Sequence, residues 1–233
     1  MSGQLLMIKI LSNDWINLTF IVIFVLLVVN KLLFHKRFAL LSNTFFGKKY
    51  FSVYIKDTPL VGSTFNIIFL PINLLTIGLT IFYISKEYFP EAFQNYNFTT
   101  YLFIVIAILI FKTLKVVLSI IINHILDSYK TFRHFSFFKL SFRNVISIVL
   151  LPFLIIHQYS LLSNSITLTL LMSVFIGLTV IQYLQSSYLI ITQKQQSILY
   201  LFLYLCTLEI VPFIIYVKLT FILIENFLIA FKG

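Results

Sequence analysis

Acidic residues are scarce in this chain, which has seven of them against 17 Lys and Arg residues. Charged residues of both signs make up only 10% of the sequence, whereas soluble globular domains carry about 25%. Hydrophobic residues make up 60%, and a water-soluble fold of that composition would expose more contiguous apolar surface than soluble proteins tolerate. The composition therefore excludes a soluble domain and indicates a polytopic membrane protein.

Residues and motifs that carry chemistry are also few. The single cysteine, Cys206, lies in an apolar run, so it forms no intramolecular disulfide and is either a small buried hydrophobic residue or a reactive thiol. The four histidines have no metal-ligand spacing, and the sequence contains no glycine-rich phosphate loop, nucleophile elbow or paired carboxylates. We therefore expect no metal or other cofactor, and a catalytic function is disfavoured.

Long apolar runs, by contrast, account for most of the chain. A helix needs about 20 mostly apolar residues to cross a membrane. Six runs approach or exceed this length, at residues 15–34, 64–85, 99–125, 145–162, 166–191 and 197–217. A shorter apolar tail, at 219–231, either extends the last helix or lies at the membrane interface. We therefore predict one membrane domain over residues 1–233, an all-α transmembrane bundle of six spans.

Basic residues are concentrated in three of the segments that connect these spans. Eleven of them lie at the end of span one or between spans one and two, three and four, or five and six: Lys31, Lys36, Arg37, Lys48, Lys49, Lys56, Lys130, Arg133, Lys139, Arg143 and Lys194. Short loops rich in Lys and Arg stay in the cytoplasm. We therefore predict that these three segments are cytoplasmic and that both the N and the C terminus lie outside.

Two of the basic segments, at 36–55 and 128–142, also contain many aromatic residues. Such a mixture suits the headgroup layer of an anionic leaflet. Stacking on single-stranded nucleic acid is an alternative for the same composition, but beside six spans we favour the lipid bilayer and expect no nucleic-acid partner. Docking of a partner subunit stays open as a third interpretation.

The predicted spans contain three Lys or Glu residues far from their ends, Lys112, Lys115 and Glu209. A charge in the membrane is unfavourable unless it is paired or neutralised, so Glu209 marks either a site or an internal lock, and we predict that it faces protein. The helical rise places Lys112 and Glu209 at similar depths, which allows an ion pair between spans three and six. Snorkelling of both lysines to the headgroups, with Glu209 protonated, is the alternative.

The sixth predicted span carries further polar groups near Glu209. Cys206, Glu209 and Tyr216 fall on one helical stripe, and Pro212 frees a backbone carbonyl beside the acid. These groups would form an intramembrane polar site that Tyr216 joins only if the helix bends. Ordinary packing is the favoured explanation, because Phe residues occupy the same stripe.

A second candidate site precedes the fourth predicted span. Arg143 and Asn144 stand directly before residue 145, and Lys139 and Arg133 precede them. Arg143 is suited to a lipid phosphate and Asn144 to capping the start of the helix. Contact with a partner protein, or ordinary anchoring at the interface, would explain the same residues.

Two stretches carry a resemblance to a known family. Residues 139–153 (KLSFRNVISIVLLPF) and 200–213 (YLFLYLCTLEIVPF) resemble the characteristic stretches of an uncharacterised family of bacterial integral membrane proteins, defined only as a domain of unknown function. The general layout of the chain is also similar. The resemblance implies a bacterial cytoplasmic membrane, of the Bacteroidota, and it implies no activity.

These observations favour a non-catalytic membrane subunit or assembly factor that binds another integral membrane protein, or a second copy of itself. A small transporter or proton-linked conduit that uses Glu209 and Lys112 is the alternative. A lipid-modifying enzyme is the least favoured class, since only Arg143 and the basic loops support it.

Overall fold

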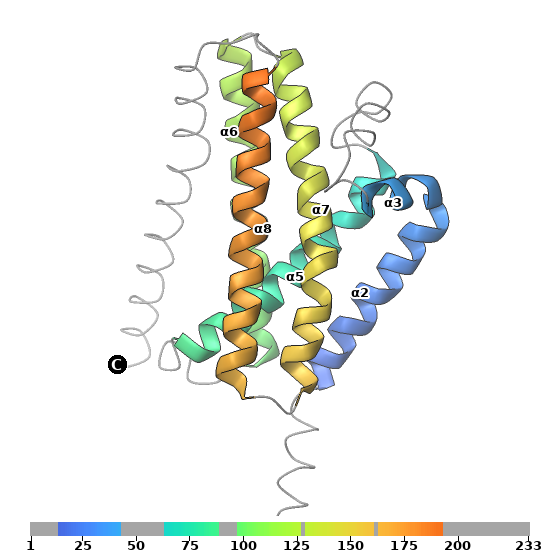
Figure 1. Cartoon of the computed structure of the whole chain (residues 1–233), viewed down its shortest axis with the longest axis vertical. Coiled ribbons are helices and arrows are strands. Elements are labelled where there is room, and N and C mark those ends of the chain that lie inside the picture. The colour runs from blue at the N-terminus through green and yellow to red at the C-terminus, as the bar shows by residue number, and fades with distance from the viewer. Residues whose placement is uncertain (1–13, 43–62, 89–96, 127–128, 161–162, 193–233) are drawn as a thin grey trace, which may run out of the picture.

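The computed structural model describes residues 14–42, 63–88, 97–126, 129–160 and 163–192. Within these ranges the chain forms helices and no strands. The helices, labelled in Figure 1, are α2 (Asp14–Leu33), α3 (His35–Ser42), α5 (Thr64–Tyr88), α6 (Phe98–Leu126), α7 (Tyr129–Tyr159) and α8 (Asn164–Thr192). The predicted all-α fold class is confirmed.

Five of these helices are long and apolar enough to cross a membrane. The qualifying segments are Asp14–Leu33, Thr64–Tyr88, Phe98–Val117, Ser136–Tyr159 and Asn164–Gln185. They overlap the first five spans expected from the sequence, and they form a helical membrane bundle. The sixth expected span, at 197–217, and the tail at 219–231 lie outside the described residues, so the count of six and the placement of both termini stay predictions.

Helix α5 forms the centre of the bundle. It runs obliquely across the other helices (Figure 1) and packs against α2, α6 and α7. In its most apolar stretch 56% of the residues are buried, against 17% in the corresponding stretches of α6 and α8. The outward faces of α6 and α8 are therefore the surfaces that the described bundle leaves open to lipid or to another protein.

One end of the bundle is held by an aromatic cluster around Trp15. Its ring lies 5.2 Å from those of Phe82 and Tyr101 and 5.8 Å from that of Phe98, which joins α2, α5 and α6. Near this cluster Gly78 lets α5 and α6 approach closely, because a Cβ atom there would lie 2.7 Å from a methyl carbon of Val105. Small residues at such crossings are typical of membrane helices.

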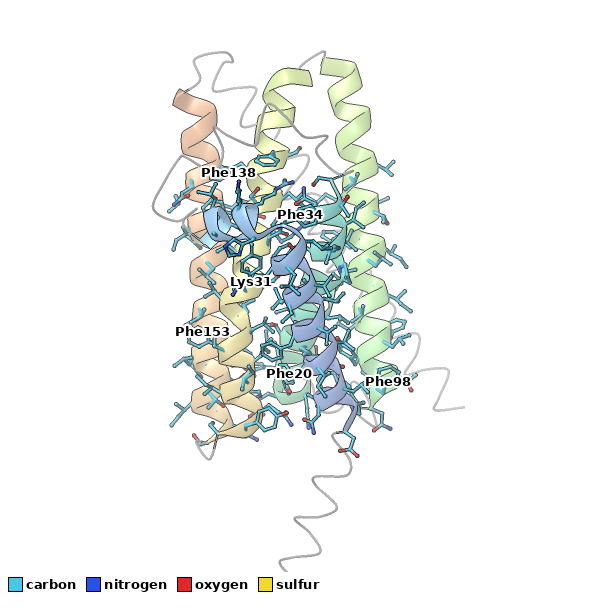
Figure 2. All side chains as sticks on the ribbon, turned by 90° about the vertical axis from the view of Figure 1, so that its right-hand side faces the viewer. Phe20, Lys31, Phe34, Phe98, Phe138 and Phe153 are labelled. Atoms are coloured by element: carbon cyan, nitrogen blue, oxygen red, sulfur yellow. The ribbon has the colours of Figure 1, made fainter. Side chains whose placement is uncertain are left out.

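The short helix α3 lies across the bundle near the other end of α2 (Figure 2). Its residues His35 and Lys36 are exposed, whereas Leu41 is fully buried. Arg37 is buried too, with its guanidinium carbon 4.5 Å from the centre of the Phe65 ring on α5. An amphipathic helix of this kind suits the membrane interface, so we expect that interface to meet the bundle at the level of α3.

Candidate functional site

Four polar side chains between α5 and α7, here called the asparagine network, are bonded to one another inside the bundle. Ser147 donates to the Oδ1 of Asn73, and Asn73 donates to the Oδ1 of Asn144 over 2.8 Å. Asn144 in turn donates to the Oδ1 of Asn66 over 3.4 Å. All four side chains are at most 5% exposed, so the network is closed to solvent and to lipid.

The asparagine network also bonds to the backbone of both helices. Asn73 donates to the carbonyl of Phe69 over 2.9 Å, and Ser147 donates to the carbonyl of Arg143 over 3.2 Å. Buried amides must find partners where no water is present. The network therefore fixes the register and rotation of α5 against α7, and its polar groups are not free to bind a ligand.

The structure corrects the interpretation of Asn144 as a helix cap. The sequence places the start of the fourth span at residue 145, whereas α7 begins at Tyr129 and runs without a break to Tyr159. Asn144 therefore lies well inside the helix. It faces α5, where it occupies the middle of the asparagine network.

Four basic side chains, here called the basic cluster, converge where α6 meets α7. Lys112 and Lys115 are three residues apart on α6, and Lys139 and Arg143 are four residues apart on α7, so each pair shares one helix face. Arg143 is close enough to interact electrostatically with the other three. The amino groups of Lys115 and Lys139 are also within hydrogen-bonding reach of each other. Residues predicted separately as an intramembrane site and as a headgroup contact thus form one cluster.

Helix α8 borders the basic cluster on a third side. The side chain of Gln182 donates to the carbonyl of Lys139 over 3.4 Å. The amino group of Lys139 lies 5.9 Å from the centre of the Tyr183 ring, which is at the long limit of a cation–π contact. Elements α6, α7 and α8 therefore position the cluster together.

No carboxylate of the described residues lies near the basic cluster. The acidic residues in these ranges are Asp14 at the start of α2 and Glu87 in the last turn of α5. Both lie at the Trp15 end, and Phe98 of that end is about 21 Å from Lys112 along α6 at about 1.5 Å per residue. The Nε atom of Arg143 is buried, and it has no hydrogen-bond partner within the described ranges. The electrostatics of the cluster therefore favour an anion.

A third polar layer lies at the Trp15 end of the bundle. Its hydrogen bonds join α5 to α7, α7 to α8 and α7 to α2: Tyr83 to Gln158 at 2.7 Å, His157 to Thr167 at 2.8 Å, and Tyr159 to Asn17 at 2.5 Å. The Tyr83 ring also packs edge-on against the imidazole of His157. These side chains bind one another across helices, so the layer holds the helix ends together.

The remaining predicted site residues lie beyond what the structure describes. Glu209, Cys206 and Tyr216 are outside the described residues, and with them the proposed pair of Lys112 and Glu209. Arg133 belongs to α7, but its side chain is not among those described. Nothing in the described ranges forms a group of three or more His, Cys, Asp or Glu residues able to hold a metal.

Sequence reasoning missed three members of the asparagine network: Asn66, Asn73 and Ser147. One signal was available, because Asn66 and Asn73 are seven residues apart and so fall on the same helix face. Two amides on one face of an apolar span indicate a polar contact with another helix. The partners on α7, more than 70 residues away in sequence, carry no comparable signal.

Comparison with known proteins identifies a family. Residues 16–220 match the family described as a domain of unknown function (DUF4271). No curated protein and no solved structure matches the chain. The matched region extends over nearly the whole sequence and contains both the asparagine network and the basic cluster. The chain therefore belongs to the DUF4271 family.

Proposed function

We propose that this protein is a non-catalytic subunit or accessory factor that binds another integral membrane protein, in the cytoplasmic membrane of a bacterium. The observation that carries the proposal is that the asparagine network is bonded to itself and to the backbone of α5 and α7. A conduit needs polar groups along a hydrated path, whereas these four side chains are at most 5% exposed and are hydrogen-bonded to one another. A rigid, internally bonded bundle is what a scaffold needs.

The outward faces of α6 and α8 are the surfaces that a partner would use. Both are apolar and open over most of their length, with Ile110 on α6 61% exposed and Ile176 on α8 54% exposed. Lipid covers whatever part of these faces a partner leaves free. Aromatic and aliphatic side chains of this kind are usual in the centres of protein interfaces.

Site-specific photo-crosslinking in native membranes tests the proposal. A photoreactive residue at Ile110 or Ile176 should give one dominant protein adduct, while the same residue at the fully buried Leu79 should give only contacts within the chain. Ile110→Trp or Ile176→Trp should then reduce co-purification of that partner at least tenfold without lowering the melting temperature. Adducts with lipid alone, together with a monodisperse monomer after mild extraction, would contradict a partner-binding role.

A small transporter or proton-linked conduit is the second candidate, and the basic cluster is the observation that favours it. Charged residues within membrane spans often belong to ion or proton pathways. Purified protein in liposomes should then carry a proton or anion flux that Lys112→Gln abolishes and the exposed-site control Lys36→Gln leaves unchanged. Flux indistinguishable from that of empty liposomes would eliminate this candidate and leave the proposed partner-binding role untouched.

A further inference from the structure

The basic cluster lies close to the level of the membrane interface that α3 marks. Phe137 of α7 contacts α3, since its ring centre is 5.9 Å from the guanidinium carbon of Arg37. Lys139 follows two residues later in the helix, and Figure 2 shows Phe138 at the level of α3. Lys139 is therefore within about 3 Å of this level along α7, and Arg143 is within about 9 Å, at about 1.5 Å per residue.

Four basic groups gathered at this position would be stabilised by a nearby negative charge. Like charges in a medium of low dielectric constant repel one another strongly, and each also loses hydration. Arg143 shows the same need in its geometry, because its buried Nε donor has no hydrogen-bond partner within the described ranges.

The surroundings of the cluster are those of a lipid rather than of a soluble anion. On α6 the neighbouring side chains Leu114 and Val117 are exposed and apolar, and on α8 Leu184 is 66% exposed beside Tyr183. Acyl chains would run along these faces towards the middle of the membrane. A planar guanidinium with lysine ammonium groups is a combination that suits phosphate oxygens.

We propose that Lys112, Lys115, Lys139 and Arg143 form a binding site for the phosphate group of an anionic phospholipid. Arg143 supplies directed N–H donors, and the three lysines supply positive charge around the phosphate. Gln182 and Tyr183 border the site on α8, and the acyl chains lie against α6 and α8. The site is independent of the proposed partner-binding role, because it needs only this chain and a lipid.

Lipid exchange on the purified full-length protein, followed by native mass spectrometry, tests the site. We expect phosphatidylglycerol to bind at least tenfold more tightly than phosphatidylcholine, and Lys139→Gln with Arg143→Gln to remove that preference. The matched control is Lys36→Gln, which removes an exposed positive charge from α3 and should change the affinity less than twofold. If the double variant does not fold, Lys112→Gln with Lys115→Gln on α6 removes the same amount of charge and should give the same loss.

Three results would overturn the proposal. One is equal binding of the two lipids by the wild-type protein, or an unchanged preference in both double variants. Another is full displacement of the lipid by millimolar inorganic phosphate, which would assign the site to a free anion. The third is a zero-length crosslink, made by a carbodiimide in native membranes, between Lys139 or Lys115 and a carboxylate of another protein. That crosslink would make the cluster a docking site for an acidic protein segment.

Discussion

The polar residues on the two sides of helix α7 have opposite surroundings. Towards α5, the side chains of Asn144 and Ser147 are hydrogen-bonded to Asn66 and Asn73, so that donors meet acceptors. Towards α6 and α8, Lys139 and Arg143 meet two further cations. Complementary polar groups stabilise a fold, whereas basic groups gathered in one place favour a bound anion. The first side of α7 is structural, and the second is the candidate for binding.

The largest effect should come from breaking the asparagine network at its centre. Asn73→Leu removes the acceptor of Ser147 and the donor to Asn144, leaving buried polar atoms without partners. We expect the free energy of unfolding in detergent to fall by about 2–3 kcal/mol. Asn164→Leu, at an exposed position at the start of α8, is the control and should change it by less than about 0.5 kcal/mol. Equal effects of the two substitutions would show that the network does not hold α5 against α7.

A smaller loss of stability is expected from a substitution where α5 approaches α6. In Gly78→Ala the new methyl group would lie 2.7 Å from a side-chain carbon of Val105 and 3.3 Å from one of Tyr101. Overpacking of this kind costs about 1–2 kcal/mol, and Val105→Ala in the same chain should restore most of it. Gly177→Ala on α8 is the matched control, because its methyl group meets open space and should stabilise the helix by about 0.5 kcal/mol. A thermal unfolding series that ranks the two glycine variants equally would contradict the close packing at Gly78.

On the other side of α7, a substitution should increase the stability of the protein instead of lowering it. Lys139→Gln removes one of four repelling charges, so in neutral phosphatidylcholine micelles we expect it to raise the stability by roughly 1 kcal/mol. Added phosphatidylglycerol should raise the melting temperature of the wild-type protein more than that of the variant, because a ligand stabilises only the form that binds it. Lys139→Gln that destabilises the protein in neutral lipid would mean that Lys139 is already neutralised within the chain.

The smallest loss of stability should come from substitutions in the polar layer at the Trp15 end. Tyr159→Phe removes the hydrogen bond to Asn17, and the Tyr159 side chain is exposed. The net contribution of such a bond is about 0.5 kcal/mol. Tyr83→Phe removes a more buried bond, to Gln158, and should cost about twice as much. Urea or thermal unfolding of both variants in one detergent would check the order, and a larger loss for Tyr159→Phe would contradict it.

The fold class is predictable because the length of apolar runs is a property of the sequence alone. Charges stand out against such runs, which is why the sequence by itself makes candidates of Lys112, Lys115, Lys139 and Arg143. Their convergence is not predictable, because it depends on how α6 and α7 pack. The members of the asparagine network are harder to recognise in the sequence. An uncharged amide does not stand out in an apolar span, and its role becomes clear only from its partner on another helix.

The start of α7 shows a further limit of the apolar signal. Residues 129–135 are basic and aromatic, so they resemble a headgroup segment and their composition predicts a connecting loop. The structure continues the helix through them, because helical geometry does not end where hydrophobicity does. The earlier start of the helix places Asn144 inside the span, and this changes its role from a cap to a member of the asparagine network.

The most direct test of the contrast across α7 is a cryo-electron microscopy structure in nanodiscs that contain phosphatidylglycerol, with a bound antibody fragment to add mass. We predict phosphate density between α6 and α7 within about 3.5 Å of the Arg143 guanidinium, and no added density among Asn66, Asn73, Asn144 and Ser147. Two results would contradict the account. One is a carboxylate of the chain itself beside Arg143, and the other is the absence of lipid density around the four basic side chains.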